Sequence, residues 1–420
     1  MKILFAPIGD PKNYKEVEYV VDGLDHRYHT KASFDALRKA LGIEYVVVYA
    51  GLSLCDLTKN RSYEDCVNYV TKYVKDKLNI NDIDLIIAPN VFGNTFVQED
   101  RKNTLFFNFI YYNTLKLLED KKPDEVYIDI THGINYMPLL ATDAIKLASY
   151  TYMVNEKETL NLSTFNSEPV VQGVSGPYHI TRVYEEKTST RLSLLHVLSP
   201  FLSKDHKNKV QNNVLKGETL CDADLVYSSV TALLSGIFPY IASIKGELGE
   251  CFRAVEDKLS VLDYKNFRVK TEVKDEGGAN KLVYKDKLPV ELSHLHSFLN
   301  VAMKVTSNVK AGDEVRLSDI KEMAEKFSVS ETVKSMVLNE IDLMKKKDIG
   351  KEPRLYAEIL ANSGREEEEH KKSGKECEPN MRNLYAHAGF ERNVTYLRKE
   401  GAEIYVSYGK CLENVKRHIK

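Results

Sequence analysis

The eight residues Val126-Tyr-Ile-Asp-Ile-Thr-His-Gly133 decide how the first half of this chain folds. Their first part, Val126–Ile130, is mainly apolar without regular polar alternation, which is typical of a strand buried on both faces of a parallel sheet. Three similar runs precede it, at Ile3–Ala6, Tyr45–Ala50 and Leu85–Ala88. Stretches with a helical spacing of apolar residues separate these runs, so the sequence predicts a doubly wound α/β domain.

The helices expected in this domain are Ser33–Leu41, Tyr63–Leu78, Leu105–Leu118 and Pro138–Ser149. Two β-like segments follow, Thr159–Phe165 and Tyr178–Tyr184, and we expect them to close the edge of the sheet. The polar stretch Glu185–Ser189 then marks a boundary. The first domain is therefore expected to span residues 1–187.

The second half of the chain changes to helical patterns, at Leu225–Ile244, Glu291–Val305, Ser318–Phe327 and Glu331–Lys347. Ser318 and Ser330 are the expected N-caps of the last two helices. Asp275-Glu276-Gly277-Gly278 lies between two β-like segments and predicts a hairpin, while Glu403–Ser407 alternates like a short strand. We expect a mainly α-helical domain over residues 188–420, with insertions around 255–290 and 310–375.

Composition limits the class of protein. A length of 420 residues favours two domains, and a net charge of −2 argues against a coating of basic charge made for duplex DNA. The six cysteines include no C-x-x-C pair, so neither a zinc knuckle nor a thioredoxin-like site is indicated. Scattered thiols without a cleavable signal peptide are typical of a reducing cytoplasm. No uncharged apolar run is long enough to span a bilayer, so no membrane partner is expected.

The turn Asp129–Gly133 is a candidate ligand site, because ligands of open α/β sheets bind beyond the carboxyl ends of the strands. The loops after the first and third strands should lie at the same edge. An ordinary strand–turn–helix junction with capping residues is the alternative. No Walker or dinucleotide glycine motif occurs, which argues against nucleoside triphosphates and dinucleotides. The candidate contacts are Gly9, Asp10, Asn94, Thr131, His132, Gly133 and Asn135.

A second motif, Arg382-Asn-Leu-Tyr-Ala-His387, pairs a cation with an imidazole and is followed by Ala388-Gly389. The small residues leave room for a backbone or a substrate to approach. The Arg-x4-His spacing occurs twice more, at Arg191–His196 and Arg365–His370. Leucines in the first copy favour a packed helix, and four glutamates in the second would repel a phosphate.

An arginine and a histidine with no metal ligand beside them can cleave RNA through its own 2′-hydroxyl. The histidine, with an ordinary pKa of about 6.5, moves protons, and the arginine fork binds phosphate oxygens. Positions five apart on a regular helix differ by about 140°, so a groove between two chains would unite the pair more easily. A surface Arg382 and a half-buried His387 that only pack a terminal helix form the alternative.

The order and separation of the two motifs resemble the CRISPR-associated accessory ribonucleases of type III systems, with an N-terminal CARF sensor and a C-terminal HEPN nuclease. The resemblance covers the whole chain and implies a Rossmann-like first domain and a helical HEPN domain. It also implies a homodimer or higher homo-oligomer in which two CARF domains bind one cyclic oligoadenylate, in archaeal relatives usually the tetra-adenylate.

Such binding would activate a composite HEPN site that cuts single-stranded RNA without a metal cofactor in antiviral defence. By motif match, Arg382 and His387 would be catalytic with Asn383 in support, and the products would end in a 2′,3′-cyclic phosphate. Thr131, His132, Gly133 and Asn135 would contact the activator, together with Gly9 and Asp10 from their position in the fold. A CARF transcription regulator that binds DNA through a helix–turn–helix-like segment, Ser318–Lys347, is the competing interpretation. The mixed charges of Glu331–Glu340 argue against that segment as a basic reading helix.

Overall fold

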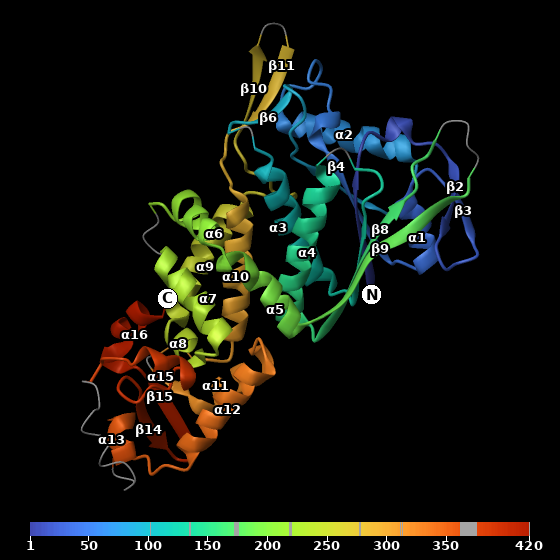
Figure 1. The fold of residues 1–420 in the computed structure, drawn as a ribbon. Coiled ribbons are helices and arrows are strands. Elements are labelled where there is room, and N and C mark those ends of the chain that lie inside the picture. The colour runs from blue at the N-terminus through green and yellow to red at the C-terminus, as the bar shows by residue number, and fades with distance from the viewer. Residues whose placement is uncertain are drawn as a thin grey trace. The chain divides into compact units, whose positions relative to one another are not determined.

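The computed structural model describes residues 1–100, 102–133, 136–171, 176–217, 221–276, 279–310, 312, 314–361 and 376–419. The chain forms two compact units (Figure 1). The N-terminal unit comprises Met1–Ser189 and Asp257–His294, and the C-terminal unit comprises Thr190–Glu256 and Leu295–Lys420. These are units of packing. The assignment of residues 1–187 to sensing and 188–420 to cutting stays a prediction.

The N-terminal unit is built on an eight-stranded sheet with the order β3-β2-β9-β8-β7-β1-β4-β5. Its parallel part confirms the predicted α/β fold and consists of β1 (Lys2–Ile8), β4 (Tyr45–Gly51), β5 (Asp84–Ala88), β7 (Glu125–Asp129) and β8 (Thr159–Ser167). The connecting helices are α1 (Ser33–Leu41), α2 (Tyr63–Leu78), α3 (Thr104–Lys121) and α4 (Met137–Glu156). Right-handed crossovers place α1 and α2 on one face of the sheet and α3 and α4 on the other (Figure 1).

The predicted sheet edge is wrong. β8 lies inside the sheet, and β9 (Tyr178–Ser189) runs antiparallel beside it. The true edge is made by β2 (Val17–Val21) and β3 (Arg27–Thr30), which add to β9. Both strands are short. β3 (Arg-Tyr-His-Thr) has no apolar run, whereas β2 (Val-Glu-Tyr-Val-Val) carries a β-like pattern that the sequence analysis missed. They form because β9 offers a free row of backbone hydrogen-bonding groups, which is a tertiary cause.

Local signals set the helix bounds well where capping residues are present. Ser62 caps α2 by accepting a hydrogen bond from the backbone N–H of Asp65, and Asn79 ends it in the left-handed conformation. The apolar stripe between these caps is buried at Val70, Val74 and Leu78. The helix therefore covers Tyr63–Leu78 as the periodicity predicts.

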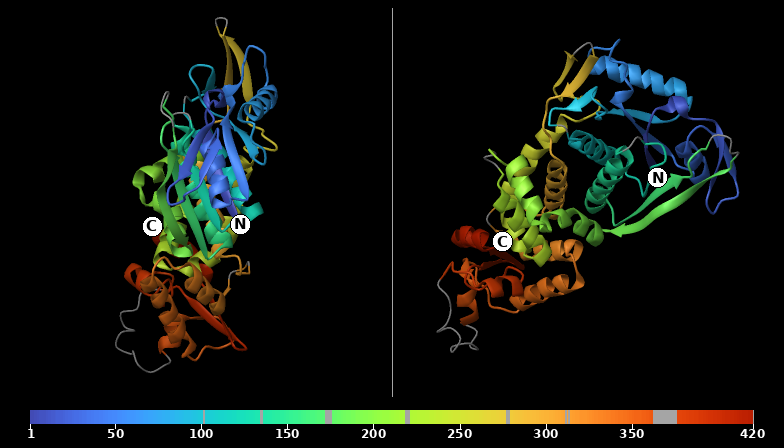
Figure 2. Two further views of the ribbon diagram at one scale, coloured as in Figure 1. Left: turned by 90° about the vertical axis from the view of Figure 1, so that its right-hand side faces the viewer. Right: turned by 45° about the horizontal axis from the view of Figure 1, so that its top comes forward.

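The predicted hairpin exists, but it packs with the first half of the chain. β10 (Thr271–Glu276) and β11 (Ala279–Tyr284) pair antiparallel, and β11 adds to β6 (Phe96–Gln98), beside which Figure 2 shows it. The buried amide of Asn113 in α3 also fixes this segment, because it donates to the carbonyl of Leu262 and accepts from the N–H of Tyr264. The residues next to the hairpin in the sequence do not indicate that it pairs with β6 or that Asn113 binds the segment before it.

The C-terminal unit is mainly helical, as predicted. Its helices of nine or more residues are α5 (Thr190–Leu198), α7 (Ala223–Ser235), α9 (Lys245–Ser260), α10 (Val290–Val305), α11 (Leu317–Phe327) and α12 (Glu331–Lys345). The end of α9 and the start of α10 fall within residues Asp257–His294, which are assigned to the N-terminal unit. The shorter helices are α6 (Lys204–Lys209), α8 (Phe238–Ser243), α13 (Tyr356–Ala361), α15 (Met381–Ala386) and α16 (Leu412–His418). A small sheet has the order β12-β15-β14-β13, with β12 (Val315–Arg316), β15 (Glu403–Ser407), β14 (Tyr396–Glu400) and β13 (Arg354–Leu355).

Two local predictions in this unit need correction. The expected helix Leu225–Ile244 is broken at Gly236, whose φ of +72° ends α7 before α8 begins. Ser330 caps α12 as predicted, but Ser318 does not cap α11, because that helix already begins at Leu317.

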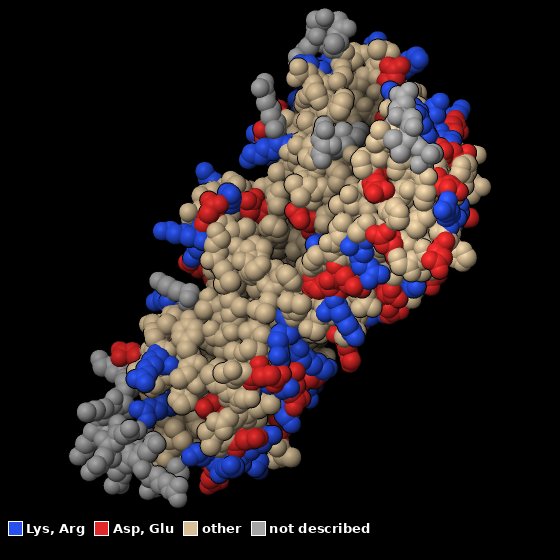
Figure 3. Space-filling view, turned by 45° about the vertical axis from the view of Figure 1, so that its right-hand side comes forward, with Lys and Arg blue, Asp and Glu red and all other residues tan. Residues whose placement is uncertain are grey.

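The expectation of separate thiols is also wrong. All six cysteines form disulfides, which join Cys55 to Cys66, Cys221 to Cys251 and Cys377 to Cys411. Separations of 11, 30 and 34 residues hide these pairs from any local pattern. In the described part of the chain, no helix has the length and apolar character to cross a membrane. Charges of both signs are interspersed over the face seen in Figure 3, in keeping with the small net charge.

Candidate functional sites

The loops after β1 and β7 meet where the strand order of the parallel sheet reverses. β1 pairs with β4 on one side and β7 on the other, so this point is the topological switch point of the domain. The N–H of Gly9 donates to the carbonyl of His132, and the hydroxyl of Tyr14 donates to the same carbonyl over 3.1 Å. The structure therefore brings Gly9 and His132 together, as the sequence predicted.

His132 is held inside the loop by contacts on two sides. Its Nε2 accepts a hydrogen bond from the N–H of Ser33 over 3.1 Å, and its ring stacks on Tyr14 with centroids 4.3 Å apart. Burial lowers the pKa of His132, and the charge of Asp129 only partly opposes that effect. The imidazole is therefore neutral near pH 7, with its proton on Nδ1.

Thr131 and Gly133 also have structural partners. The Thr131 hydroxyl donates to Asp129 and accepts from the N–H of Ser167 over 2.9 Å. A Cβ on Gly133 would lie 2.1 Å from the ring of Pro138 in α4, so only glycine fits there. The turn is thus both a structural junction and part of a candidate ligand site. Its residues hold the strand–turn–helix junction together, and two of them, Thr131 and His132, also line a cavity.

That cavity, of about 460 Å³, is a candidate ligand pocket. Besides Thr131 and His132 it is lined by residues that the sequence did not single out, among them Asn13, Lys15, Lys31 and Asn166. Lys15 and Lys31 give it two cations. Lys31 lies between β3 and α1, whereas Lys15 lies just before β2, and no sequence motif marked either residue.

The other predicted contacts lie elsewhere. The Asp10 side chain accepts from the N–H of Lys12 and from the hydroxyl of Tyr73 in α2. Asn94 is exposed in the turn before β6 and does not line the pocket. Asn135 lies outside the described residues.

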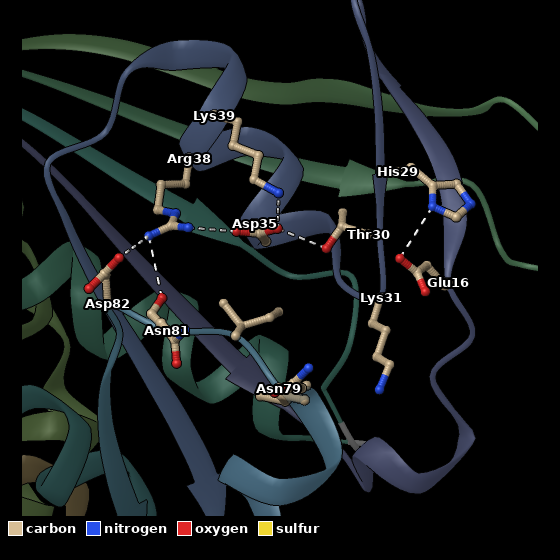
Figure 4. A pocket seen from close by; sticks show the side chains of 12 residues that line it. Glu16, His29, Thr30, Lys31, Asp35, Arg38, Lys39, Asn79, Asn81 and Asp82 are labelled. Carbon is tan, nitrogen blue, oxygen red and sulfur yellow. Dashed lines mark hydrogen bonds and ion pairs between the residues drawn. The ribbon is translucent and has the colours of Figure 1, made fainter.

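A neighbouring pocket of about 360 Å³ is polar and shares Lys31 with the first (Figure 4). Several of the charged side chains that line it form ion pairs with one another. Arg38 and Lys39 both pair with the buried carboxylate of Asp35, and His29 pairs with Glu16. No unmatched charge on these side chains points to a ligand.

The second motif lies on α15 and just beyond it. Asn380 caps this short helix by accepting from the N–H of Asn383 over 3.1 Å. Arg382 is exposed in its first turn, whereas His387 follows the last turn with φ −109° and ψ 27°. His387 is thus the C-cap residue of α15, and its N–H still donates to the carbonyl of Asn383 over 2.9 Å.

His387 has a partner that the sequence did not reveal. Its Nδ1 lies 3.0 Å from Oε1 of Glu340, a residue of α12 whose side chain is only 9% exposed, while the imidazole is 49% exposed. This hydrogen bond raises the pKa of His387, and burial only partly offsets it. The site offers a half-exposed imidazole, with a buried carboxylate behind it.

The two small residues after His387 do not leave space for a substrate. Ala388 and Gly389 are buried, with φ values of +50° and +88° that turn the chain back on itself. A Cβ on Gly389 would lie 2.6 Å from Ile237 and 2.8 Å from the hydroxyl of Tyr408. Glycine is needed for close packing, which corrects the expectation from the sequence.

Of the two other Arg-x4-His copies, Arg365–His370 lies outside the described residues. In the other, Arg191 forms an ion pair with Glu331. Leu194 is buried as expected, but Leu192 and Leu195 are each 38% exposed, so the packing prediction is wrong for those two. Among the described residues, no group of three or more His, Cys, Asp or Glu side chains is arranged to hold a metal ion.

Comparison with known proteins decides the family. Residues 3–169 match the model of the CARF domain of CRISPR system endoribonuclease Csx1, and residues 330–410 match the model of the HEPN domain of the same family. The chain belongs to the CRISPR-associated CARF–HEPN endoribonucleases. The first matched segment contains the residues that line the candidate pocket except Val170, and the second contains the Arg382–His387 motif.

One curated relative of this CARF–HEPN protein is the CRISPR system endoribonuclease Csx1 of Methanocaldococcus jannaschii. The two are 24% identical, over 97% of this chain and 87% of the relative. A solved structure of Enterococcus italicus Csm6 bound to cyclic hexa-2′-fluoro-hexa-dAMP aligns over 93% of this chain and 91% of its own, at 12% identity. Its TM-score of 0.28 is too low to establish a common fold.

Proposed function

We propose that this protein is a cyclic oligoadenylate-activated, metal-independent endoribonuclease that cuts single-stranded RNA in type III CRISPR antiviral defence. The observation that carries the proposal is the half-exposed imidazole of His387, hydrogen-bonded to Glu340 within the matched HEPN segment. An exposed Arg382 stands in the same short helix motif. Membership in an endoribonuclease family supports the same chemistry.

In the proposed reaction, the ribose 2′-hydroxyl attacks the neighbouring phosphorus. His387 Nε2 accepts the hydroxyl proton or, in its charged form, gives a proton to the departing 5′-oxygen. Arg382 binds the phosphate oxygens, on which negative charge builds up, and Asn383 supports that contact. The 2′-oxygen replaces the 5′-oxygen on phosphorus, so the products carry a 2′,3′-cyclic phosphate and a free 5′-hydroxyl.

A second copy of the chain completes the site. One HEPN motif offers one imidazole, whereas the reaction needs both a base and an acid. The surface beside the motif has exposed apolar side chains, because Met381 is 38% exposed next to Arg382 and Leu343 is 41% exposed on α12. Apolar groups at the edge of a polar site are typical of subunit contacts.

The CARF pocket is the proposed activator site. Lys15 and Lys31 supply positive charge for phosphates, and Thr131 and His132 shape its floor. A cyclic tetra-adenylate is the proposed ligand, because a symmetric ring suits two copies of one pocket. Gly9 and Gly133 do not line the pocket, and they support its wall, because the Gly9 N–H donates to the carbonyl of His132 and Gly133 packs closely on Pro138. Asp10 and Asn94 have no direct role in this assignment.

The competing function, a DNA-binding regulator, is less well supported. α11 and α12 do form a helix–turn–helix-like pair, but α12 turns a buried stripe that includes Glu340 toward the core. The HEPN match begins at residue 330 and includes α12. The match therefore supports a place for α12 in the nuclease domain.

The test is cleavage of a labelled single-stranded RNA with and without cyclic tetra-adenylate, in the presence of EDTA. We expect cleavage that depends on the activator and product ends that resist ligation until the cyclic phosphate is removed. Absence of cleavage with tetra- and hexa-adenylate rings alike, together with tight binding to duplex DNA, would favour the regulator instead.

A further inference from the structure

Glu340 occupies a position where an apolar side chain would be expected. The buried residues of α12 are Val337, Glu340, Ile341 and Met344, which together make one helical stripe facing the core. A charged carboxylate on such a stripe is costly unless a partner compensates it. In the sequence, Glu340 lies between Asn339 and Ile341, and no local pattern indicates its partner.

The partner is His387, 47 residues later in the chain. Among the described residues, the bond from His387 Nδ1 is the hydrogen bond that the Glu340 carboxylate makes. A buried acid whose one recorded partner is the imidazole of the nuclease motif is better explained by that imidazole than by helix packing. Two other charges act on the ring from the segment after α15, where Glu391 raises the pKa of His387 and Arg392 lowers it.

We infer that Glu340 is a positioning residue of the nuclease, a role that rests on the proposed function. Because a carboxylate accepts from Nδ1, that nitrogen keeps its proton, and Nε2 remains as the atom that exchanges a proton with RNA. Glu340 also stabilises the imidazolium that forms when Nε2 takes the 2′-hydroxyl proton.

Glu391 is the other buried acid near this ring, and its contacts give it a different role. Its carboxylate accepts from the N–H and from the side-chain amide of Asn393. Those bonds tie the turn after α15 together and leave Glu340 as the acid hydrogen-bonded to the imidazole. Burial raises the pKa of Glu391, and its bonds to Asn393 give it a structural role in this turn.

The experiment compares Glu340→Gln with a matched control, Glu256→Gln. Glu256 also bonds a histidine, since Nε2 of buried His296 lies 2.6 Å from its carboxylate, but this pair is not part of the nuclease motif. With activator saturating, kcat and KM for RNA are measured from pH 5 to pH 9 for both variants, alongside thermal unfolding and activator binding.

We expect Glu340→Gln to lower kcat by about 10- to 100-fold at pH 7, with KM for RNA little changed, which is the order found for carboxylates that orient metal-bound histidines. The limb of the pH profile that His387 controls should move to lower pH, whether the ring acts as acid or as base, because a neutral amide no longer favours the imidazolium. Glu256→Gln should keep the wild-type kcat and pH profile.

A wild-type kcat and an unmoved pH profile in Glu340→Gln, while His387→Ala is inactive, would overturn this inference and leave the proposed function standing. Full activity in His387→Ala would overturn the proposed function itself. Should Glu340→Gln fail to fold, nitrogen NMR of the wild-type ring decides, with His387→Ala used for assignment. A neutral His387 protonated on Nδ1 supports the positioning role, and protonation on Nε2 overturns it.

Discussion

The two motif histidines of this chain receive opposite environments. His132 lies at the end of β7, stacked on Tyr14 and bonded to a backbone N–H, and burial lowers its pKa. His387 lies beyond α15, half exposed, and its bond to Glu340 raises its pKa. One ring is a neutral part of a pocket wall, whereas the other is a group that can carry a proton. A histidine in a motif therefore acquires its role from its partners.

The largest expected effect is the loss of cleavage in His387→Ala. Removal of a general acid–base group should lower the cleavage rate by about 10²- to 10⁴-fold or more, because no other group on the motif can move the proton. Activator binding should be unchanged, since the pocket lies in the other unit. Single-turnover cleavage and titration with labelled cyclic tetra-adenylate measure the two effects. Near wild-type cleavage would mean that Arg382–His387 only packs a terminal helix.

The corresponding substitutions in the CARF unit should act on activation and not on the cutting step. Thr131→Ala and His132→Ala each remove hydrogen bonds that shape the pocket, and a net loss of about 1 kcal/mol corresponds to a roughly fivefold weaker activator. The activator concentration at half-maximal cleavage should therefore rise roughly fivefold, while the fully activated cleavage rate is retained. Unchanged midpoints and unchanged binding in both variants would show that the turn is a structural junction only.

The pH dependence should separate the two histidines. The lowered pKa of His132 means that its neutral form persists below the ordinary value of 6.5 and is lost only as the pH falls through the lowered pKa, so activator binding should weaken toward acid pH. The raised pKa of His387 means that its charged form persists above pH 6.5 and is lost as the pH rises further. Cleavage at saturating activator should therefore titrate above pH 6.5, and activator binding should titrate below it. If cleavage and activator binding had the same pH midpoint, the proposed difference between His387 and His132 would be wrong.

The smallest expected effect is that of metal removal. Neither histidine belongs to a group of metal ligands among the described residues, and the proposed chemistry uses an imidazole and a guanidinium. Dialysis against EDTA should leave both the cleavage rate and the 2′,3′-cyclic phosphate ends unchanged. Products with 3′-hydroxyl ends, or a rate restored only by Mg²⁺ or Mn²⁺, would point to a metal-activated water.

The sequence by itself determined the elements whose signals are local. The parallel strands follow from unbroken apolar runs, and α2 follows from its stripe between the capping residues Ser62 and Asn79. The same holds for the Arg382–His387 motif and the Asp129–Gly133 turn, because both are contiguous. Such features depend on backbone preference and on the spacing of residues within a few turns of one another.

Only the tertiary structure decided the features that join distant residues. The edge strands β2 and β3 depend on β9, and the hairpin β10–β11 depends on β6. The partner of His387 comes from α12, and the close packing at Gly389 comes from Ile237 and Tyr408. The physical reason is the same in each case. Hydrogen bonds, burial and pKa shifts act through space over a few ångströms, and separation along the chain does not encode which residues will lie that close.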